Sequence, residues 1–247
     1  MTASRPFEHR GTPSPFPPSG YERSLLGDRD VVALSAVAAA VADALAGAPT
    51  LAAWAAASAA REIAGGRGPA WRVELGGVPA AVRHYRRGGW MGPLLGDRYL
   101  DATPRPFVEL SVSESLRGAG VPTPRVLAAV VVPAHPGYRA DIATEWLSPG
   151  LDLEEFLRPN LYPAAERAAA IEEAGRTIGR AHEEGLDHPD LRPRNVFLQP
   201  LEGGRWKAAL LDLDRARIAA RGARAPAKKK TSSGSTGLLR RSFARAA

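Results

Sequence analysis

The chain contains 247 residues, of which 45% are hydrophobic and 24% are charged, and it has no cysteine. This composition suits a folded protein with a hydrophobic core, and it excludes a collagen-like chain or one disordered throughout. The absence of cysteine excludes disulfides, thiolate zinc sites, iron–sulfur clusters and a cysteine nucleophile, and it suits a reducing compartment.

The net charge of +7 is concentrated at the C-terminus. Residues 221–247 contain eight Lys or Arg residues and no acidic residue, so removing their charge from the total leaves −1 for residues 1–220. A nearly neutral folded body indicates no basic surface, and nucleic acid is therefore not expected as a partner. The basic tail instead favours an anionic membrane surface as the partner that it binds. The alternative is a disordered, solubilising tail.

The N-terminal half is expected to begin with a flexible segment, residues 1–24, followed by an Ala-rich helical extension over residues 25–64. Apolar residues three or four apart, from Leu34 to Leu45, predict a helix with Asp28 or Asp30 as its cap. A second helix is predicted from Thr50 to about Gly65. Because the least polar stretch is interrupted by Asp, Gly and Pro, no transmembrane segment is expected.

Residues 65–147 have a strand-rich pattern. Alternation from Trp71 to Leu75, a Gly76–Gly77 turn and a returning strand over Val78–His84 predict a hairpin. A helix is predicted from Pro104 to Leu116. A second hairpin is expected to pair Val126–Val132 with Tyr138–Trp146.

Residues 148–220 are expected to be mainly helical. A short helix is predicted over Asp152–Leu157 and a long one over Pro163–His182, followed by strands over Val196–Leu198 and Lys207–Leu211. The overall prediction is an α+β fold with a basic tail, residues 221–247.

One motif carries the strongest chemical signal. His188, Asp190 and Asn195 have the H-x-D-x-x-x-x-N spacing of a phosphotransferase catalytic loop, and an apolar strand then leads to Asp212. Asp190 is predicted to be the catalytic base that accepts the proton of an attacking hydroxyl. Asn195 and Asp212 are predicted to hold Mg²⁺, because this hard cation prefers oxygen ligands. An ordinary polar turn is the alternative, and the combination of loop and strand disfavours it.

A kinase also needs a cation that binds the nucleotide phosphates and pairs with a helix glutamate. None of the four Lys residues lies in the N-terminal half, so Arg83 on the predicted strand is the candidate and Glu109 is its expected partner. The glycine cluster that includes Gly66 and Gly68 is a candidate loop over the phosphates; a simple tight turn is the alternative.

Several segments together resemble a known family. They are GRGPAW (66–71), VRHYRRGG (82–89), LLGDRYL (94–100), FVEL (107–110), GVPTPRVLAA (120–129), YRADIATEWL (138–147), HPDLRPRNVFL (188–198) and LLDLDRARI (210–218). The sequence resembles the lipopolysaccharide kinases of the protein-kinase-like superfamily, most closely the 3-deoxy-D-manno-octulosonic acid (Kdo) kinases. In that family an Arg at the position of Arg83 is expected.

The resemblance implies a two-lobed, protein-kinase-like fold with an antiparallel-sheet N-lobe (65–147) and a small helical C-lobe (148–220). It implies ATP and Mg²⁺ as cofactors and phosphorylation of Kdo on Kdo-lipid A, in a Gram-negative cytoplasm at the inner-membrane surface. Glu145 to Leu147 would form the hinge that meets adenine through backbone groups. Two departures from the family pattern are the Ala-rich region and Leu213 in place of the usual Phe.

The acceptor side is predicted from charge. Arg86 and Arg87 are candidates for binding the carboxylate or phosphates of an anionic acceptor, and two solvated loop arginines are the alternative. Other readings remain open: a heptose kinase, a small-molecule kinase of the aminoglycoside or choline type, or a non-catalytic pseudokinase.

Overall fold

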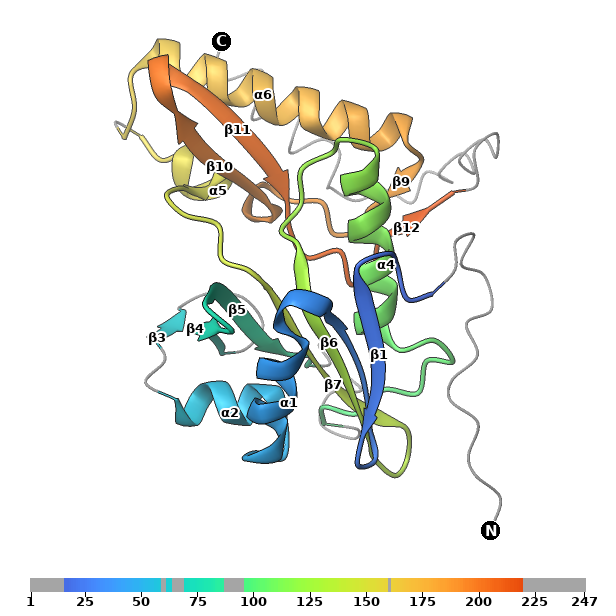
Figure 1. Ribbon diagram of the computed structural model, residues 1–247. Helices are drawn as coiled ribbons and strands as arrows, with labels where there is room; N and C mark the ends of the chain where they lie inside the picture. The colour runs from blue at the N-terminus through green and yellow to red at the C-terminus, as the bar shows by residue number, and fades with distance from the viewer. Residues whose placement is uncertain (1–15, 59–60, 64–68, 87–95, 160, 220–247) are drawn as a thin grey trace. The chain divides into compact units, whose positions relative to one another are not determined.

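The computed structural model of the chain describes residues 16–58, 61–63, 69–86, 96–159 and 161–219 (Figure 1). The chain divides into two units. The first comprises Met1–Glu114 and Arg125–Trp146, and the second comprises Ser115–Pro124 and Leu147–Ala247. Helices and antiparallel strands occur in both units, so the predicted α+β class is confirmed.

An antiparallel sheet of seven strands forms the first unit, in the order β1-β2-β6-β7-β5-β4-β3. The strands are β1 (Tyr21–Leu26), β2 (Arg29–Leu34), β3 (Arg61–Ile63), β4 (Ala70–Leu75), β5 (Val78–His84), β6 (Val126–Pro133) and β7 (Tyr138–Glu145). Both predicted hairpins, β4–β5 and β6–β7, are confirmed. Gly76 and Gly77 close the first with φ values of 59° and 78°, which glycine adopts without steric cost.

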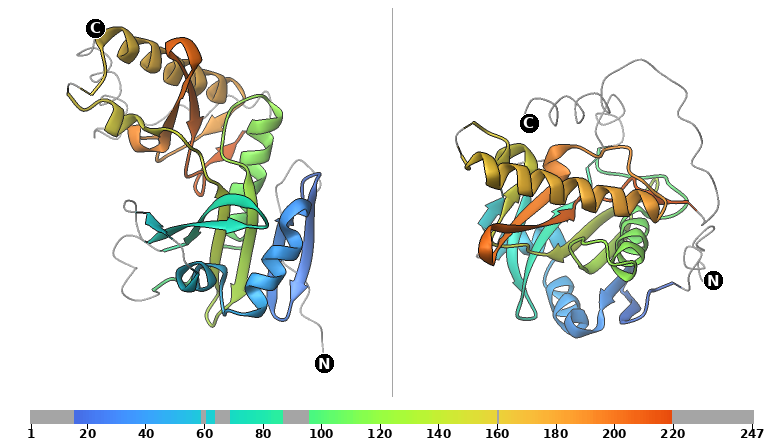
Figure 2. Two further views of the ribbon diagram at one scale, coloured as in Figure 1. Left: turned by 60° about the vertical axis from the view of Figure 1, so that its left-hand side comes forward. Right: turned by 90° about the horizontal axis from the view of Figure 1, so that it is seen from above.

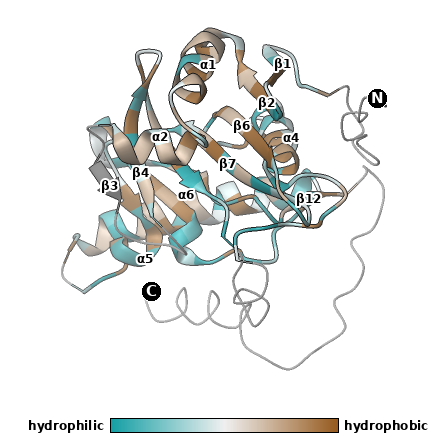
Figure 3. Cartoon of the chain, turned by 90° about the horizontal axis from the view of Figure 1, so that it is seen from below, coloured by the Kyte–Doolittle hydropathy of each residue, from teal (hydrophilic) through white to brown (hydrophobic). Residues whose placement is uncertain are grey.

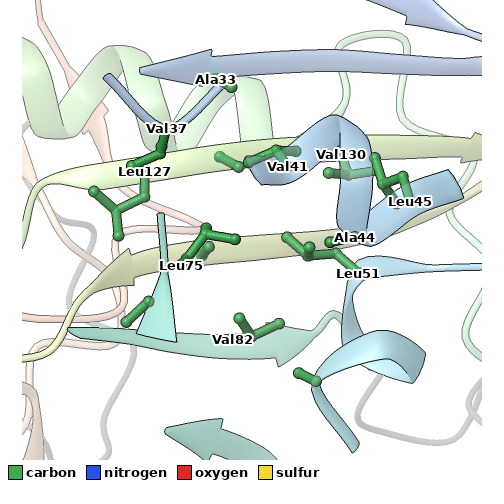
Figure 4. Packing of buried hydrophobic residues seen from close by; sticks show 14 of the residues in the cluster. Ala33, Val37, Val41, Ala44, Leu45, Leu51, Leu75, Val82, Leu127 and Val130 are labelled. Carbon is green, nitrogen blue, oxygen red and sulfur yellow. The ribbon is translucent and has the colours of Figure 1, made fainter. Parts of the chain in front are cut away.

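One face of this sheet is covered by α1 (Ala38–Ala46) and α2 (Leu51–Ala57). Their buried residues, among them Val41, Leu45 and Leu51, pack with Leu75 and Val82 of the sheet in one hydrophobic cluster (Figure 4). Thr50 caps α2 by accepting a 3.0 Å hydrogen bond from the Ala53 amide. Apolar burial therefore fixes these helices on the sheet.

The opposite face of the sheet packs against α4 (Arg105–Gly118). Phe107 and Leu110 of this helix are buried in a second cluster with Ile142 and four tyrosines. Because side chains alternate along a strand, residues 80 and 82 of β5 belong to the first cluster and Tyr85, just beyond its end, to the second. Strand β6 contributes to both clusters, and Figure 3 shows it as strongly hydrophobic.

The prediction that residues 25–34 are helical is wrong. They lie in the β1–β2 hairpin, and β2 pairs with β6, so this segment belongs to the sheet. Asp30 is not a helix cap; it accepts hydrogen bonds from Arg23 at 2.9 and 2.6 Å across the hairpin. The second helix also ends earlier than predicted, at Ala57, and a short strand, β3, follows it. Pairing with β6 selects the strand, because an unbroken apolar run fits a buried strand as well as a helix.

In the second unit, α6 (Ala164–Glu183) packs along a sheet in which β10 (Val196–Leu201) lies between β11 (Arg205–Leu210) and β8 (Leu151–Asp152) (Figure 2). Helix α5 (Leu153–Phe156) is capped by Asp152, and β9 (Leu186–Asp187) pairs with β12 (Arg217–Ile218). The predicted helices and strands of residues 148–220 are confirmed. The buried face of α6 consists of Ala170, Ala174, Thr177 and Ala181.

Within the described part of the chain, no single helix has the length and apolar composition needed to cross a membrane. Ser35–Ala46 and Leu51–Ala57 meet that criterion only as a pair, and they are bent by 77° relative to each other. Their apolar residues are buried against the sheet.

Candidate active site

The predicted catalytic loop closes on itself through backbone bonds. The Leu191 amide donates to the His188 carbonyl at 3.2 Å, and the Asn195 amide donates to the Arg192 carbonyl at 2.9 Å in a 3₁₀ turn over Pro193–Asn195. The Asn195 side-chain Nδ2 donates to the Asp190 carbonyl at 2.8 Å. Loop residues are therefore fixed by their nearest neighbours in sequence.

Both backbone polar groups of Leu211 are bound to this loop. Its amide donates to the Asn195 carbonyl at 2.9 Å, and its carbonyl accepts a 3.2 Å hydrogen bond from His188 Nε2. His188 must carry its proton on Nε2 to make this contact, and its Nδ1 has no hydrogen-bond partner among the described residues. The His188 side chain therefore ties the loop to the end of the neighbouring strand.

Asp212 directly follows Leu211 and has a φ of 56°, the one positive φ among the described non-glycine residues. The left-handed conformation is costly for most residues, although Asp tolerates it better than bulkier ones. The two bonds made by Leu211 hold Asp212 next to Asn195. Two residues separated by seventeen positions in sequence are thus neighbours, as the motif predicts.

A magnesium ion fits this pair by chemistry. Because Asn195 donates its Nδ2 to the Asp190 carbonyl, the amide oxygen Oδ1 is oriented as the available ligand. With the Asp212 carboxylate it would supply two oxygen ligands, and Mg²⁺ is commonly held by few protein oxygens plus substrate phosphates. Accordingly, the described residues contain no group of three or more His, Asp or Glu able to hold a metal by themselves.

Arg192 is a site residue that the sequence predictions missed. Its Nε lies 2.7 Å from Oδ1 of Asp190, whose side chain is only 13% exposed, while the Arg192 side chain is largely exposed. The guanidinium therefore fixes the orientation of the carboxylate and places a positive charge beside it. Arg192 stands two positions after the motif Asp, but Arg194 lies in the same loop, so the sequence alone does not single it out.

The expected ion pair of the first unit is present. Arg83 Nη2 lies 2.7 and 2.6 Å from the two carboxylate oxygens of Glu109, which comes from α4. The Tyr85 hydroxyl also donates to Glu109, and the Arg83 guanidinium lies 4.8 Å from the centre of the Tyr85 ring. Glu109 is buried and its side chain is 6% exposed, whereas that of Arg83 is 30% exposed. Arg83 is thus a fixed, accessible cation.

The other predicted residues have plainer surroundings. The Glu145 amide donates to the Arg125 carbonyl at 2.8 Å, so this group is used inside the first unit. Leu147 is the first residue of the second unit after β7, and Arg86 is exposed just beyond β5. Gly66, Gly68 and Arg87 lie outside the described residues, as does the basic tail.

Comparison with known proteins places this site in a kinase family. The model of the lipopolysaccharide kinase (Kdo/WaaP) family matches residues 51–231. The chain belongs to this family, which confirms the resemblance inferred from its motifs.

Individual relatives agree with the family match. Proteins named 3-deoxy-D-manno-octulosonic acid kinase from Xylella fastidiosa (strain M12), Vibrio vulnificus (strain YJ016) and Actinobacillus succinogenes are 39%, 33% and 40% identical, over 61%, 60% and 61% of this chain. The matched region spans only 58%, 68% and 63% of the length of these relatives. A solved structure described as WaaP in complex with acyl carrier protein has a TM-score of 0.46 and 25% identity, covering 66% of this chain and 65% of that one.

Proposed function

We propose that the chain transfers the γ-phosphoryl group of ATP to a hydroxyl of Kdo on Kdo-lipid A, a step of lipopolysaccharide core biosynthesis. The observation that carries this proposal is the arrangement of Asp190, Asn195 and Asp212, which the hydrogen bonds of Leu211 and His188 hold together. Family membership and the names of the relatives support the choice of acceptor.

The reaction forms a bond between the acceptor oxygen and the γ-phosphorus, and it breaks the bond from that phosphorus to the oxygen that leaves with ADP. Asp190 accepts the proton of the attacking hydroxyl and orients the oxygen. Mg²⁺, held by Asn195 Oδ1 and the Asp212 carboxylate, would neutralise charge on the phosphates. Arg192 keeps the Asp190 carboxylate in place.

Other residues of the chain bind substrates. Arg83, held by Glu109, binds ATP phosphates, and the glycines at 66 and 68 cover them. Glu145 and Leu147 belong to the segment that meets adenine. Arg86 and Arg87 bind the carboxylate or phosphates of the acceptor, for which the fork of a guanidinium is suited.

The test is to incubate the purified chain with Mg-ATP and Kdo-lipid A and to measure the acceptor by mass spectrometry. We expect the mass of the acceptor to rise by one phosphoryl group, and Asp190→Asn to abolish that increase. A heptose-containing acceptor and an aminoglycoside serve as alternative acceptors. Absence of any product, or equal product from Asp190→Asn, would contradict the proposal.

We further propose that the basic tail brings the enzyme to the anionic surface of the inner membrane, where its lipid-linked acceptor lies. The support is the eight positive charges of residues 221–247, each of which contributes about 1 kcal/mol close to an anionic bilayer. In a sedimentation assay, a larger fraction of the full chain than of residues 1–220 should bind to anionic vesicles. Equal binding of the two would remove this role from the tail.

A further inference from the structure

The last residue of β5, His84, lies between two carboxylates. Its Nδ1 is 2.6 Å from Oδ1 of Asp141 on β7, and its Nε2 is 3.0 Å from Oδ2 of Asp97. The three residues lie in three separate segments quoted above, VRHYRRGG, LLGDRYL and YRADIATEWL, and the partners of His84 are 57 and 13 residues away, so no single motif pointed to the cluster.

The remaining carboxylate oxygens of the cluster are also bound. Oδ2 of Asp141 accepts a 2.8 Å hydrogen bond from the Ala52 amide in the first turn of α2. Oδ1 of Asp97 accepts a 3.0 Å hydrogen bond from Arg139 Nε. The described groups that face His84 are thus Asp141 and Asp97, with Arg139 behind Asp97 and the N-terminus of α2 behind Asp141.

This geometry requires His84 to be an imidazolium. An ionised carboxylate only accepts hydrogen bonds, so both ring nitrogens must carry a proton to contact two of them. Burial, the largest single effect, lowers the pKa of His84, but the hydrogen bonds and charges of Asp141 and Asp97 together raise it above its ordinary value of 6.5. Without this charge Asp141, whose side chain is 1% exposed, would be buried opposite a neutral ring.

The cluster occupies the face of β5 opposite the Arg83 pair. Residues 80 and 82 point to the α1–α2 side of the sheet, and His84 continues that series toward α2. Arg83 and Tyr85 point the other way, to Glu109 on α4. The end of β5 is therefore clamped on both faces, by an imidazolium on one and by the Arg83–Glu109 ion pair on the other.

We propose that His84, held as an imidazolium by Asp141 and Asp97, is a positioning residue that fixes Arg83 in the geometry needed to bind the phosphates of ATP. This role rests on the proposed kinase function. Loss of the charge would leave two carboxylates facing each other across a neutral side chain and would loosen the end of β5. Mg-ATP binding should weaken, while the transfer step, carried by Asp190, should change little.

Two measurements on the full chain test the proposal without an acceptor. We would record imidazole ¹⁵N NMR spectra from about pH 5 to about pH 9. Both ring nitrogens of His84 should remain protonated at pH values above the ordinary pKa of an imidazole. The Mg-ATP dissociation constant of His84→Gln, measured by calorimetry, should rise about tenfold, and that of His135→Gln, an exposed histidine of the same unit, should not change.

A pH profile separates positioning from a general loss of stability. The Mg-ATP dissociation constant of the wild type should rise as pH passes through the raised pKa of His84, and this rise should be absent from His84→Gln. If His84→Gln does not fold, Asp97→Asn, at a side chain that is 33% exposed, should lower the pH of the same rise. A neutral His84 ring at about pH 6, or unchanged Mg-ATP binding by a folded His84→Gln, would overturn the proposal. If the Mg-ATP dissociation constants change as predicted but the wild type transfers phosphate to no acceptor, only the proposed function is contradicted.

Discussion

The two units hold their candidate functional residues by different kinds of contact. In the second unit, Asp190, Asn195 and Asp212 are placed mainly by backbone hydrogen bonds within one loop and the end of β11. In the first unit, Arg83 is placed by side chains from other elements, Glu109 on α4 and, through the strand end, Asp141 on β7. Local bonds tolerate side-chain changes elsewhere, whereas a clamp of charged side chains fails when one member is lost.

The largest expected effect is on turnover in the second unit. Asp190→Asn removes the proposed proton acceptor but keeps the size of the side chain, so kcat should fall by about 10²- to 10⁴-fold in a steady-state assay. Because backbone bonds hold the loop, the melting temperature of the Asp190→Asn variant should stay close to that of the wild type. Asp187→Asn, the same change at an exposed position of β9, is the matched control and should leave kcat unchanged.

The next largest effect should come from the hydrophobic packing of α1 and α2 in the first unit, which stabilises the fold. Leu45→Ala, at a side chain that is 1% exposed in the α1–α2 cluster, should lower the free energy of unfolding by about 2–5 kcal/mol in urea titrations. Leu25→Ala, at a side chain that is 66% exposed on β1, should change it by no more than about 0.5 kcal/mol. Equal effects of the two would show that this cluster does not support the sheet.

Removing the charge of Glu109 should affect nucleotide binding more than chemistry. Glu109→Gln keeps an acceptor for Tyr85 but leaves Arg83 without its counter-charge, so the KM for ATP should rise about 10- to 100-fold. The matched control, Glu74→Gln, changes an exposed glutamate of β4 and should have no effect. A fall in kcat at unchanged KM would contradict the role given to the pair.

The smallest expected effect is the pH dependence of stability contributed by the His84 cluster. Since the pKa of His84 is raised in the fold, its contribution is complete below the ordinary value of 6.5 and is lost as pH rises through the raised value. Burial raises the pKa of Asp97, but Arg139 and His84 together lower it below 3.8, so its contribution is lost as pH falls through the lowered value. The free energy of unfolding of the wild type should thus exceed that of a doubly substituted His84→Gln, Asp97→Asn variant most clearly between these limits.

Local patterns in the sequence predicted much of this structure. Alternation and turn glycines identify β4–β5 and β6–β7, and motif spacing brings Asp190, Asn195 and Asp212 together. The need for a cation in a lysine-poor half identifies Arg83. The β1–β2 hairpin was missed because its apolar residues suit either element, and only pairing with β6 selects the strand.

The His84 cluster could not be predicted, because its carboxylates come together only when β5 and β7 pair and α2 packs on the sheet. Arg192 was missed for a different reason. An arginine in a loop with other arginines has no distinguishing pattern until its contact with Asp190 is known.

The most direct test of the division of roles is the Mg-ATP dissociation constant of Asp190→Asn compared with that of Glu109→Gln, both measured by calorimetry on the full chain. We predict that Asp190→Asn binds Mg-ATP as the wild type does although its kcat is about 10²- to 10⁴-fold lower, and that Glu109→Gln binds Mg-ATP about 10- to 100-fold more weakly. Weakened binding by Asp190→Asn together with normal binding by Glu109→Gln would contradict the account.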